Sequence, residues 1–440
     1  MAGNPIETRV PAIQAPTRSP AIQSDTRIST NRSDTRISAI QTVARTLRDA
    51  EDPRIVRVVA MVDAMINRGP ADQLIAPIRP RLAILRPPRP LRFDRLLFHP
   101  LDRLIVPAAR WRPDQKALPR TALRPMADHV RLAMGAAATA IDAEIAGHTT
   151  AETALIARLG RSLWPAAAPI LGGNVIPDTW NTTALGATAY RSLAGSVAAL
   201  LAEAPALDAL CSASVADLLP PTAETVAALL ARVAKANQAA LPMMITLLLD
   251  RLPEAAGLLP TAREGQQAAA IQAAAEEAAD LLLAQLDQPA GGIQMRIAAG
   301  TLLEAGAAAS RVATLLTHLE TPDAKPLRRD QLRAVRQRLN AGCKARFVSA
   351  LEHELLAPLQ HRADPMDIAA LETAARGLRV LESEARAVGG GSIYDLLLRK
   401  AAEAIKADAT RDRLTPVEQL RLVEILSGSD AALAMLDQSV

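Results

Sequence analysis

The sequence has few aromatic residues and few cysteines, and each shortage narrows the class of protein. Only eight of its 440 residues are aromatic (three Trp, two Tyr and three Phe), although half of the residues are apolar. The core must therefore be built from Leu, Ala, Val, Ile and Met, and abundant Ala and Leu favour helices over strands. The two cysteines, Cys211 and Cys343, form neither a disulfide framework nor a CxxC motif. Two buried thiols are typical of a reducing compartment, so we expect a cytoplasmic protein.

Long apolar runs are also missing. The N-terminus has no continuous apolar segment like that of a signal peptide. The longest apolar runs, such as residues 241–249, fall short of the roughly 20 residues that cross a membrane. We therefore expect no transmembrane segment.

Lysine is scarce, because six of the 50 cationic residues are Lys and the other 44 are Arg. One explanation is phosphate recognition, since the guanidinium fork matches phosphate oxygens. The other is a codon usage that favours Ala, Arg, Pro and Leu together. We favour the second, because all four residue types are abundant.

The net charge of +4 hides an uneven distribution. Residues 1–124 hold 22 Lys and Arg against 11 Asp and Glu, a net charge of +11, whereas residues 125–440 hold 28 against 35, a net charge of −7. This asymmetry indicates that the basic N-terminal third meets an acidic surface. That surface belongs to the chain itself, a partner protein, nucleic acid or anionic lipid.

The first 43 residues contain a nine-residue repeat in which Arg9, Arg18, Arg27 and Arg36 recur. Nine residues end half a turn out of phase on an α-helix and change the face of a strand, but they complete about three turns of polyproline II. We expect a disordered, low-complexity tail. The alternative is a multivalent ligand for a repeated acidic site.

Residues 77–124 form a second unusual segment, which we name the strap. Ten prolines fall between residues 77 and 125, which forbids long helices, yet Leu, Ile, Phe and Val are too frequent for a disordered linker. We expect an extended strap with short helical turns, whose apolar side chains enter grooves of a helical body. Its candidates for binding an anion or a partner are Arg79, Arg81, Arg86, Arg89 and Arg92.

Capping residues, prolines and glycines divide the rest of the chain into helices. The patterns predict a helix over 52–68 with a core-facing apolar stripe formed by Ile55, Val58, Val59, Val62, Met65 and Ile66. They predict further helices from Pro125 to Ala146, from Thr222 to about Ala240, from Pro242, between Gly292 and Leu319, and from Pro365 to Val388. They also predict capping boxes at Thr149/Glu152 and Thr261/Glu264, a hinge at Gly389–Gly391, a cap at Ser392, and a helix start at Thr415–Glu418. No run alternates as a strand does.

One constellation on these helices is a candidate for a metal site. Cys343, Glu352, His353, Glu354 and His361 resemble a metal set, but the two His are eight residues apart instead of four, so we predict no metal site. No serine or cysteine nucleophile motif is present either, and we predict no catalytic residue and no cofactor.

The strongest charge pattern lies on the helix after Pro326. Arg329, Arg333 and Arg336 fall within about 60° of one another on a helical wheel. They could bind phosphates, form an exposed face, or pair with acidic residues of neighbouring helices. The scarcity of aromatic residues nearby weakens the nucleic-acid interpretation.

Together these patterns predict an all-α fold, as a multi-helix bundle or an irregular helical array. The expected parts are a disordered tail at 1–43, first helices at 44–76, the strap at 77–124, a helical domain at 125–320 and a C-terminal helical subdomain at 321–440.

Three functional hypotheses follow. We favour a non-enzymatic interaction or scaffold protein with a protein partner, which docks through the tail and the strap. The second is a nucleic-acid-associated protein that uses the basic segments 79–124 and 328–346, with binding that weakens steeply with salt. The third is an enzyme whose site is assembled from distant helices in a polar, concave pocket. A secreted effector with an N-terminal export signal is a minor fourth hypothesis.

Overall fold

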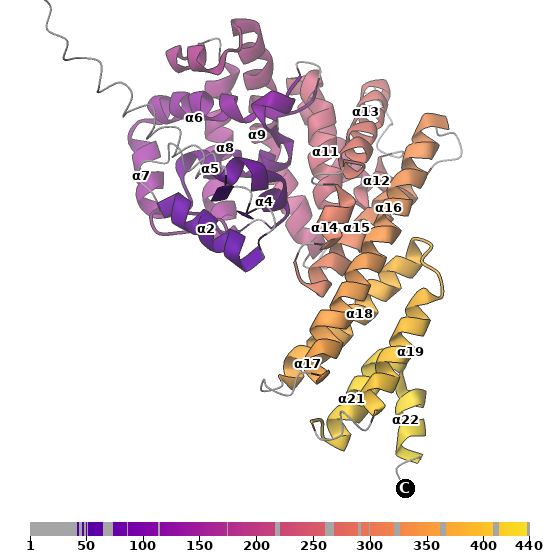
Figure 1. The fold of residues 1–440 in the computed structure, drawn as a ribbon. Helices are drawn as coiled ribbons and strands as arrows, with labels where there is room; N and C mark the ends of the chain where they lie inside the picture. The colour runs from indigo at the N-terminus through magenta and orange to yellow at the C-terminus, as the bar shows by residue number, and fades with distance from the viewer. Residues whose placement is uncertain are drawn as a thin grey trace, which may run out of the picture. The chain divides into compact units, whose positions relative to one another are not determined.

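A computed structural model describes most of the chain beyond the repeat tail (Figure 1). The described residues are 42–43, 46–47, 50, 52–64, 74–85, 87–112, 115–173, 175–215, 221–259, 268–288, 292–298, 300–320, 326–360, 367–407 and 413–437. Contacts divide the chain into two units, residues 1–79 and 80–440. The expected disorder of the tail falls almost entirely outside the described residues.

The first unit is described chiefly as α2 (Asp52–Ala64) and the short 3-10 turn η1 (Ala76–Ile78). Ile55, Val59 and Val62 of α2 are buried, as the apolar spacing predicts. The predicted end of this helix at residues 65–69 lies outside the described residues.

Nearly all described residues of the second unit are helical, which confirms the all-α fold. Its helices and turns up to residue 251 are α4 (Arg79–Leu85, which begins at the boundary between the units), α5 (Phe93–Phe98), η2 (His99–Leu104), η3 (Ala108–Arg110), α6 (Arg120–Met134), α7 (Ala136–Ile145), α8 (Thr153–Gly172), η4 (Asp178–Thr183), α9 (Ala187–Val215), α10 (Ala223–Ala236), η5 (Gln238–Ala240) and α11 (Leu241–Arg251). The later ones are α12 (Ala255–Leu258), α13 (Ala268–Leu286), α14 (Ile293–Ala298), α15 (Leu302–Leu319), α16 (Pro326–Ala350), the π-helical η7 (Leu351–Leu356), α17 (Ala357–Gln360), α18 (Ile368–Ala387), α19 (Ile393–Lys406), α21 (Pro416–Ser427) and α22 (Ser429–Asp437). Within the described ranges, strands are limited to the parallel two-residue pair β1 (Ile105–Val106) and β2 (Leu118–Pro119).

The strap lies on the helical body, with short turns separated by extended residues, as predicted. Its main chain pairs with the α7–α8 connection, where Leu91 N–H donates to the His148 carbonyl at 2.8 Å and Thr150 N–H donates to the Arg89 carbonyl at 2.8 Å. The Trp164 indole of α8 donates to the Leu96 carbonyl at 3.0 Å. The strap side chains in the core include Leu91, Phe93, Leu96, Leu97, Phe98, Leu101, Leu104 and Leu118. The strap is therefore an integral layer of the fold.

A single connected cluster of buried side chains extends from the strap to α21. The scarce aromatic residues are concentrated in it, because seven of the eight are buried and the eighth, Trp111, is half-buried. Two edge-to-face pairs, Trp180–Tyr190 and Phe347–Tyr394, have ring centroids 4.9 and 5.0 Å apart. The aromatic residues thus serve packing, in a core that is otherwise aliphatic.

The predicted single helix from Pro125 to Ala146 is wrong. The helix α6 begins earlier, at Arg120, and Gly135 separates it from α7 with φ +54° and ψ −119°. A residue with a Cβ atom rarely adopts that conformation, so glycine allows the chain to change direction there. The single helix predicted between Gly292 and Leu319 is likewise two helices, α14 and α15, because Thr301 and Glu304 form a capping box that starts α15.

Some of the predicted helix starts are confirmed and others are not. Thr222 and Thr415 cap α10 and α21 as predicted, although the partner of Thr222 is Thr225. At Thr149 only half of the predicted box forms, because Glu152 accepts from Thr149 N–H while α8 begins at Thr153. Ser392 precedes α19 without a side-chain capping bond. The Thr261/Glu264 pair lies outside the described residues.

Within the described residues, one helix is long and apolar enough to cross a membrane by length and composition alone. It is the 26-residue stretch Ala187–Ser212 of α9, and 56% of its most apolar window is buried against the rest of the fold. Figure 1 shows α9 beside α8, the helix with which it packs. Burial of this kind is also typical of a core helix, so the expectation of no transmembrane segment stays a prediction.

Arginine side chains of α16 connect it to other parts of the unit. Arg328 donates to the Glu276 carbonyl at 3.0 Å and pairs with Asp280 on α13 at 2.7 Å. Arg346 donates to the Gly300 carbonyl at 3.2 Å and pairs with Glu354 at 2.7 Å. Each of the two guanidinium groups therefore holds a main-chain oxygen and a carboxylate together.

Candidate functional site

The strap arginines predicted as binding residues are only partly available at the surface. Arg79 and Arg81 are half-buried on α4, and Arg89 is half-buried where the main chain pairs with the α7–α8 connection. Arg92 is exposed immediately before α5, and Arg86 lies outside the described residues. They occupy successive segments of the strap, and a binding role for them stays a prediction.

The predicted arginine face of α16 carries ion pairs with the chain's own carboxylates. Arg336 lies 2.8 Å from Glu320, and Arg333 lies 3.2 Å from Asp330. The hydrogen bond and the charge of Arg336 hold the pKa of Glu320 below its usual value. Arg329 is exposed on the same helix. The geometry corresponds to the alternative in which these arginines pair with acidic neighbours.

The constellation around Cys343 is not assembled as a metal site in the described part of the chain, where no three His, Cys, Asp or Glu side chains come together. Cys343 is fully buried, Glu354 pairs with Arg346, and His361 lies outside the described residues. Glu352, His353 and Glu354 occupy the π-helical turn η7, just before Pro358. A wider turn there accommodates the proline, which has no N–H to donate and clashes with the preceding turn.

A cavity of about 440 Å³ lies in the second unit, and we name it the arginine pocket. Four arginines from four elements line it: Arg103 of η2, Arg251 of α11, Arg296 of α14 and Arg311 of α15. Its volume lies within the usual range of small-molecule sites, about 300–1,000 Å³. Since Leu85 and Arg103 also line it, the strap forms part of its wall.

Asp250, the penultimate residue of α11, is the central carboxylate of the pocket. The Arg103 guanidinium donates to both of its oxygens, with an Nε–Oδ2 distance of 2.6 Å, and Arg296 Nη1 lies 4.0 Å from Oδ1. The side chains of Arg103, Asp250 and Arg296 are 25%, 15% and 21% exposed. A two-point contact in this partly buried place fixes the strap to α11.

The other two arginines have main-chain partners. Arg251 donates to the Pro100 carbonyl at 2.9 Å, and Arg311 donates to the Ala307 carbonyl of its own helix at 3.3 Å. Within the described residues, neither lies at ion-pair distance from a carboxylate. Both guanidinium groups therefore add positive charge to the pocket.

Glu304 is the second carboxylate of the pocket, and it is held at the start of α15. It accepts from Thr301 N–H at 2.7 Å, while the Thr301 hydroxyl accepts from Glu304 N–H at 3.3 Å. Among the described residues that line the pocket, four guanidinium groups therefore face two carboxylates, both of them already engaged. This excess of cationic side chains in the lining favours a negative guest.

Cys211 of α9 also lines the pocket, but it is a weak nucleophile. Burial raises the pKa of its thiol to about 11, although the nearby Arg251 acts in the opposite direction. At neutral pH the sulfur is therefore protonated, whereas nucleophilic attack needs the thiolate. The arrangement is suited to holding an anion, and it offers no activated nucleophile.

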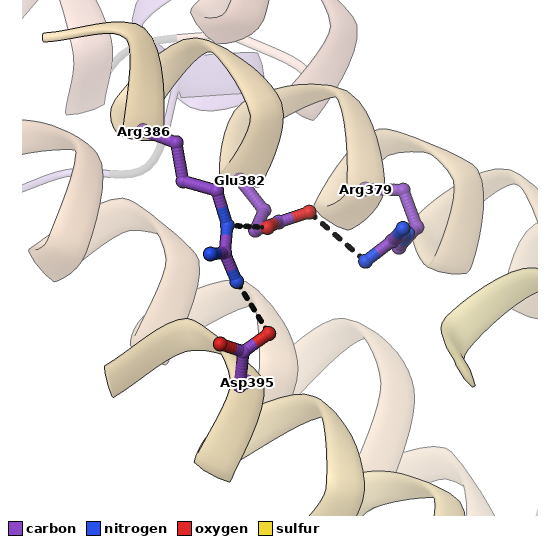
Figure 2. Close-up of polar contacts among 4 residues, drawn as sticks. All are labelled: Arg379, Glu382, Arg386 and Asp395. Atoms are coloured by element: carbon purple, nitrogen blue, oxygen red, sulfur yellow. Dashed lines mark hydrogen bonds and ion pairs between the residues drawn. The ribbon is translucent and has the colours of Figure 1, made fainter. Parts of the chain in front are cut away.

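A second cluster of arginines and carboxylates, beside the turn between α18 and α19, contains equal numbers of cations and anions. Figure 2 shows Arg379 and Arg386 on either side of Glu382, with Arg386 also reaching Asp395 on α19. Arg379 Nη1 lies 2.9 Å from Glu382, whose side chain is only 6% exposed. The hydrogen bond to Glu382 is the main reason why the pKa of Arg386 rises above its usual value. Two cations and two anions leave no net charge, and the cluster joins α18 to α19.

The arginine pocket could not be predicted from the sequence. Its charged residues are spread from position 103 to position 311, so no local spacing connects them. One local signal was present and was missed, namely the Thr301-x-x-Glu304 capping pattern that places Glu304 at the pocket.

Comparison of the chain with protein-family models, with curated proteins and with solved structures finds no match.

Proposed function

We propose that the chain is a non-enzymatic interaction protein whose arginine pocket binds an anionic ligand. One observation carries the proposal: among the described residues, four guanidinium groups and two carboxylates line one cavity. Guanidinium groups recognise carboxylate and phosphate oxygens by paired N–H donors. The excess positive charge raises the local concentration of anions around the opening.

The enzyme hypothesis asked for a polar, concave pocket, and the arginine pocket meets that requirement. The groups in it nevertheless favour recognition over chemistry. The Cys211 thiol has a raised pKa, Asp250 is held by Arg103, and Glu304 is held by Thr301. The nucleic-acid hypothesis receives less support, because Arg333 and Arg336 already pair with Asp330 and Glu320.

Arg311 offers the sharpest test, because its side-chain hydrogen bond within the described residues is to Ala307 of its own helix, so its removal should disturb the fold little. We expect inorganic phosphate to bind the full chain, by isothermal titration calorimetry at low ionic strength, and Arg311→Gln to weaken that binding about tenfold. Binding should also weaken as salt is added.

The matched control is Arg161→Gln, which removes the same charge from an exposed position of α8 that does not line the pocket. We expect it to leave phosphate affinity unchanged within about twofold. Equal losses in the two variants, or an absence of phosphate binding by the wild-type chain, would contradict the proposal.

A further inference from the structure

We infer that the ligand of the arginine pocket is an anionic amphiphile: a single phosphate or carboxylate head on an unbranched aliphatic chain. This inference rests on the proposed function and specifies the ligand class. The charges described above support the anionic head group. The aliphatic chain is supported by the apolar part of the lining, formed by Leu85, Leu249, Leu282, Leu286, Val312 and Leu315.

These apolar residues belong to the core, but they border the cavity. Leu249, Leu282, Leu286, Val312 and Leu315 are each at most 6% exposed. Their contacts with the rest of the core fix them, so the apolar wall exists before a ligand arrives. An ion alone would leave this wall in contact with water, whereas an aliphatic chain would cover it.

One face of α15 contributes both charged and apolar residues to the lining. They are Glu304, Ala308, Arg311 and Leu315, spacings that keep one face of a helix. From the first to the last of these residues the helix rises about 16 Å. The two charged side chains alternate with Ala308 and Leu315 along this face. A guest that combines a charged group with an apolar part matches this mixed lining.

The volume limits the size of the guest. A cavity of about 440 Å³ has the volume of roughly 15 water molecules at about 30 Å³ each. A head group with eight to ten chain carbons has about that number of non-hydrogen atoms. Lipids with two long chains, and peptides of several residues, exceed it.

A series of soluble alkyl phosphates tests the inference on the full chain. Inorganic, butyl, hexyl, octyl and decyl phosphate are titrated below their micelle concentrations, together with 1-octanol. We expect each added methylene group up to octyl to tighten binding about threefold to fourfold. Octanol should bind at least tenfold more weakly than octyl phosphate, because it lacks the charge. Alkyl carboxylates of the same lengths should follow the same order.

Protection of Cys211 from alkylation provides a second readout at the pocket itself. Cys211 lines the cavity, whereas Cys343 is fully buried and acts as the internal reference. Octyl phosphate should slow the alkylation of Cys211 at least fivefold and leave Cys343 unchanged. The same experiment with vesicles that contain phosphatidic acid separates a free amphiphile from a membrane lipid, and vesicles should give no protection.

Two variants of α15 show where the aliphatic chain binds. Ala308 lines the cavity, and its exposed neighbour Ala307 does not. Ala308→Phe should fill the apolar part and remove the dependence on chain length, while Ala307→Phe should keep it. Thermal unfolding of both variants verifies that each is folded.

The outcomes distinguish the inference from the proposed function. Equal affinity for all the phosphates would overturn the amphiphile and leave the anion pocket intact. Binding to vesicles alone would also overturn it, and so would an unchanged chain-length dependence in Ala308→Phe. If no phosphate of any length binds, the proposed function itself fails.

Discussion

Asp250 and Glu382 are both carboxylates held between two arginines, yet their surroundings differ. Glu382 has Arg379 and Arg386 on its own helix, and Asp395 restores neutrality. Asp250 has Arg103 and Arg296, which come from distant parts of the sequence, and it borders a cavity that contains two further arginines.

The difference in charge balance separates an arginine cluster that joins helices from one that could bind a ligand. In the Glu382 cluster every cation has an anion, so it can connect two helices but has no charge left for a guest. Among the described residues that line the arginine pocket, four are arginines and two are carboxylates. Local charge excess beside an open volume, more than the number of arginines, is what marks a binding site.

The largest effect is expected at Glu382. Glu382→Gln removes the buried anion and leaves Arg379 and Arg386 facing a neutral side chain, so we expect the free energy of unfolding to fall by about 3 kcal/mol. Urea denaturation followed by circular dichroism measures the change. Glu424→Gln, an exposed change on α21, should stay within about 0.5 kcal/mol of the wild-type chain. Comparable losses in both variants would mean that the cluster is not structural.

Asp250→Asn should lower stability less than Glu382→Gln does, and it should strengthen phosphate binding. Loss of the charged contact with Arg103 should lower the free energy of unfolding by about 2 kcal/mol. Removal of a negative charge should at the same time tighten phosphate binding about threefold. Glu320→Gln, which removes one carboxylate from an exposed pair with Arg336, is the control and should cost less than about 0.5 kcal/mol. Weaker phosphate binding in Asp250→Asn would place the anion elsewhere.

The smallest effect is a loss of stability at alkaline pH. It arises from the two buried thiols, Cys211 and Cys343. Burial raises the pKa of Cys211 from 9.0 to about 11 and that of Cys343 from 9.0 to about 12. The unfolded chain therefore loses these protons first, so the stabilisation is complete below pH 9 and is lost as the pH rises towards the folded values. Each thiol should lower the free energy of unfolding by about 1 kcal/mol between pH 9 and 10.

Urea denaturation at several pH values measures this slope, and the double variant Cys211→Ala/Cys343→Ala should flatten it. The residual slope reports other groups, among them Tyr394, whose buried hydroxyl has a pKa raised from 10.0 to about 12. A slope that is unchanged in the double variant would show that the thiols titrate alike in the folded and unfolded chains.

Features that depend on residues close together in the sequence could be predicted, whereas features that depend on distant residues could not. The caps at Thr222 and Thr415 and the buried stripe of α2 depend on residues within a turn or two, and those predictions are confirmed. The break at Gly135 was missed, because a glycine inside a helical pattern is often tolerated and only the backbone angles reveal the turn.

The pocket could not be predicted because its residues are far apart in the sequence. Arg103 and Asp250 are 147 positions apart and meet only because the strap packs against α11. A binding role for the predicted set on α16 stays a prediction, and here too sequence reasoning could not identify the partners. Helical spacing places Arg329, Arg333 and Arg336 on one face, but it does not reveal that Glu320, which precedes the helix, lies beside Arg336.

The hydrogen bonds and ion pairs of Arg328 and Arg346 limit how the high arginine content of the chain can change during evolution. Each guanidinium reaches a main-chain oxygen and a carboxylate at once, and the single ammonium of lysine cannot reproduce that fork. Codon usage can have supplied arginine in the first place, and the fold has since made it necessary at these positions. A drift of the genome towards lysine would keep the charge of the chain but loosen α16 one tie at a time, so the arginine bias is easier to acquire than to reverse.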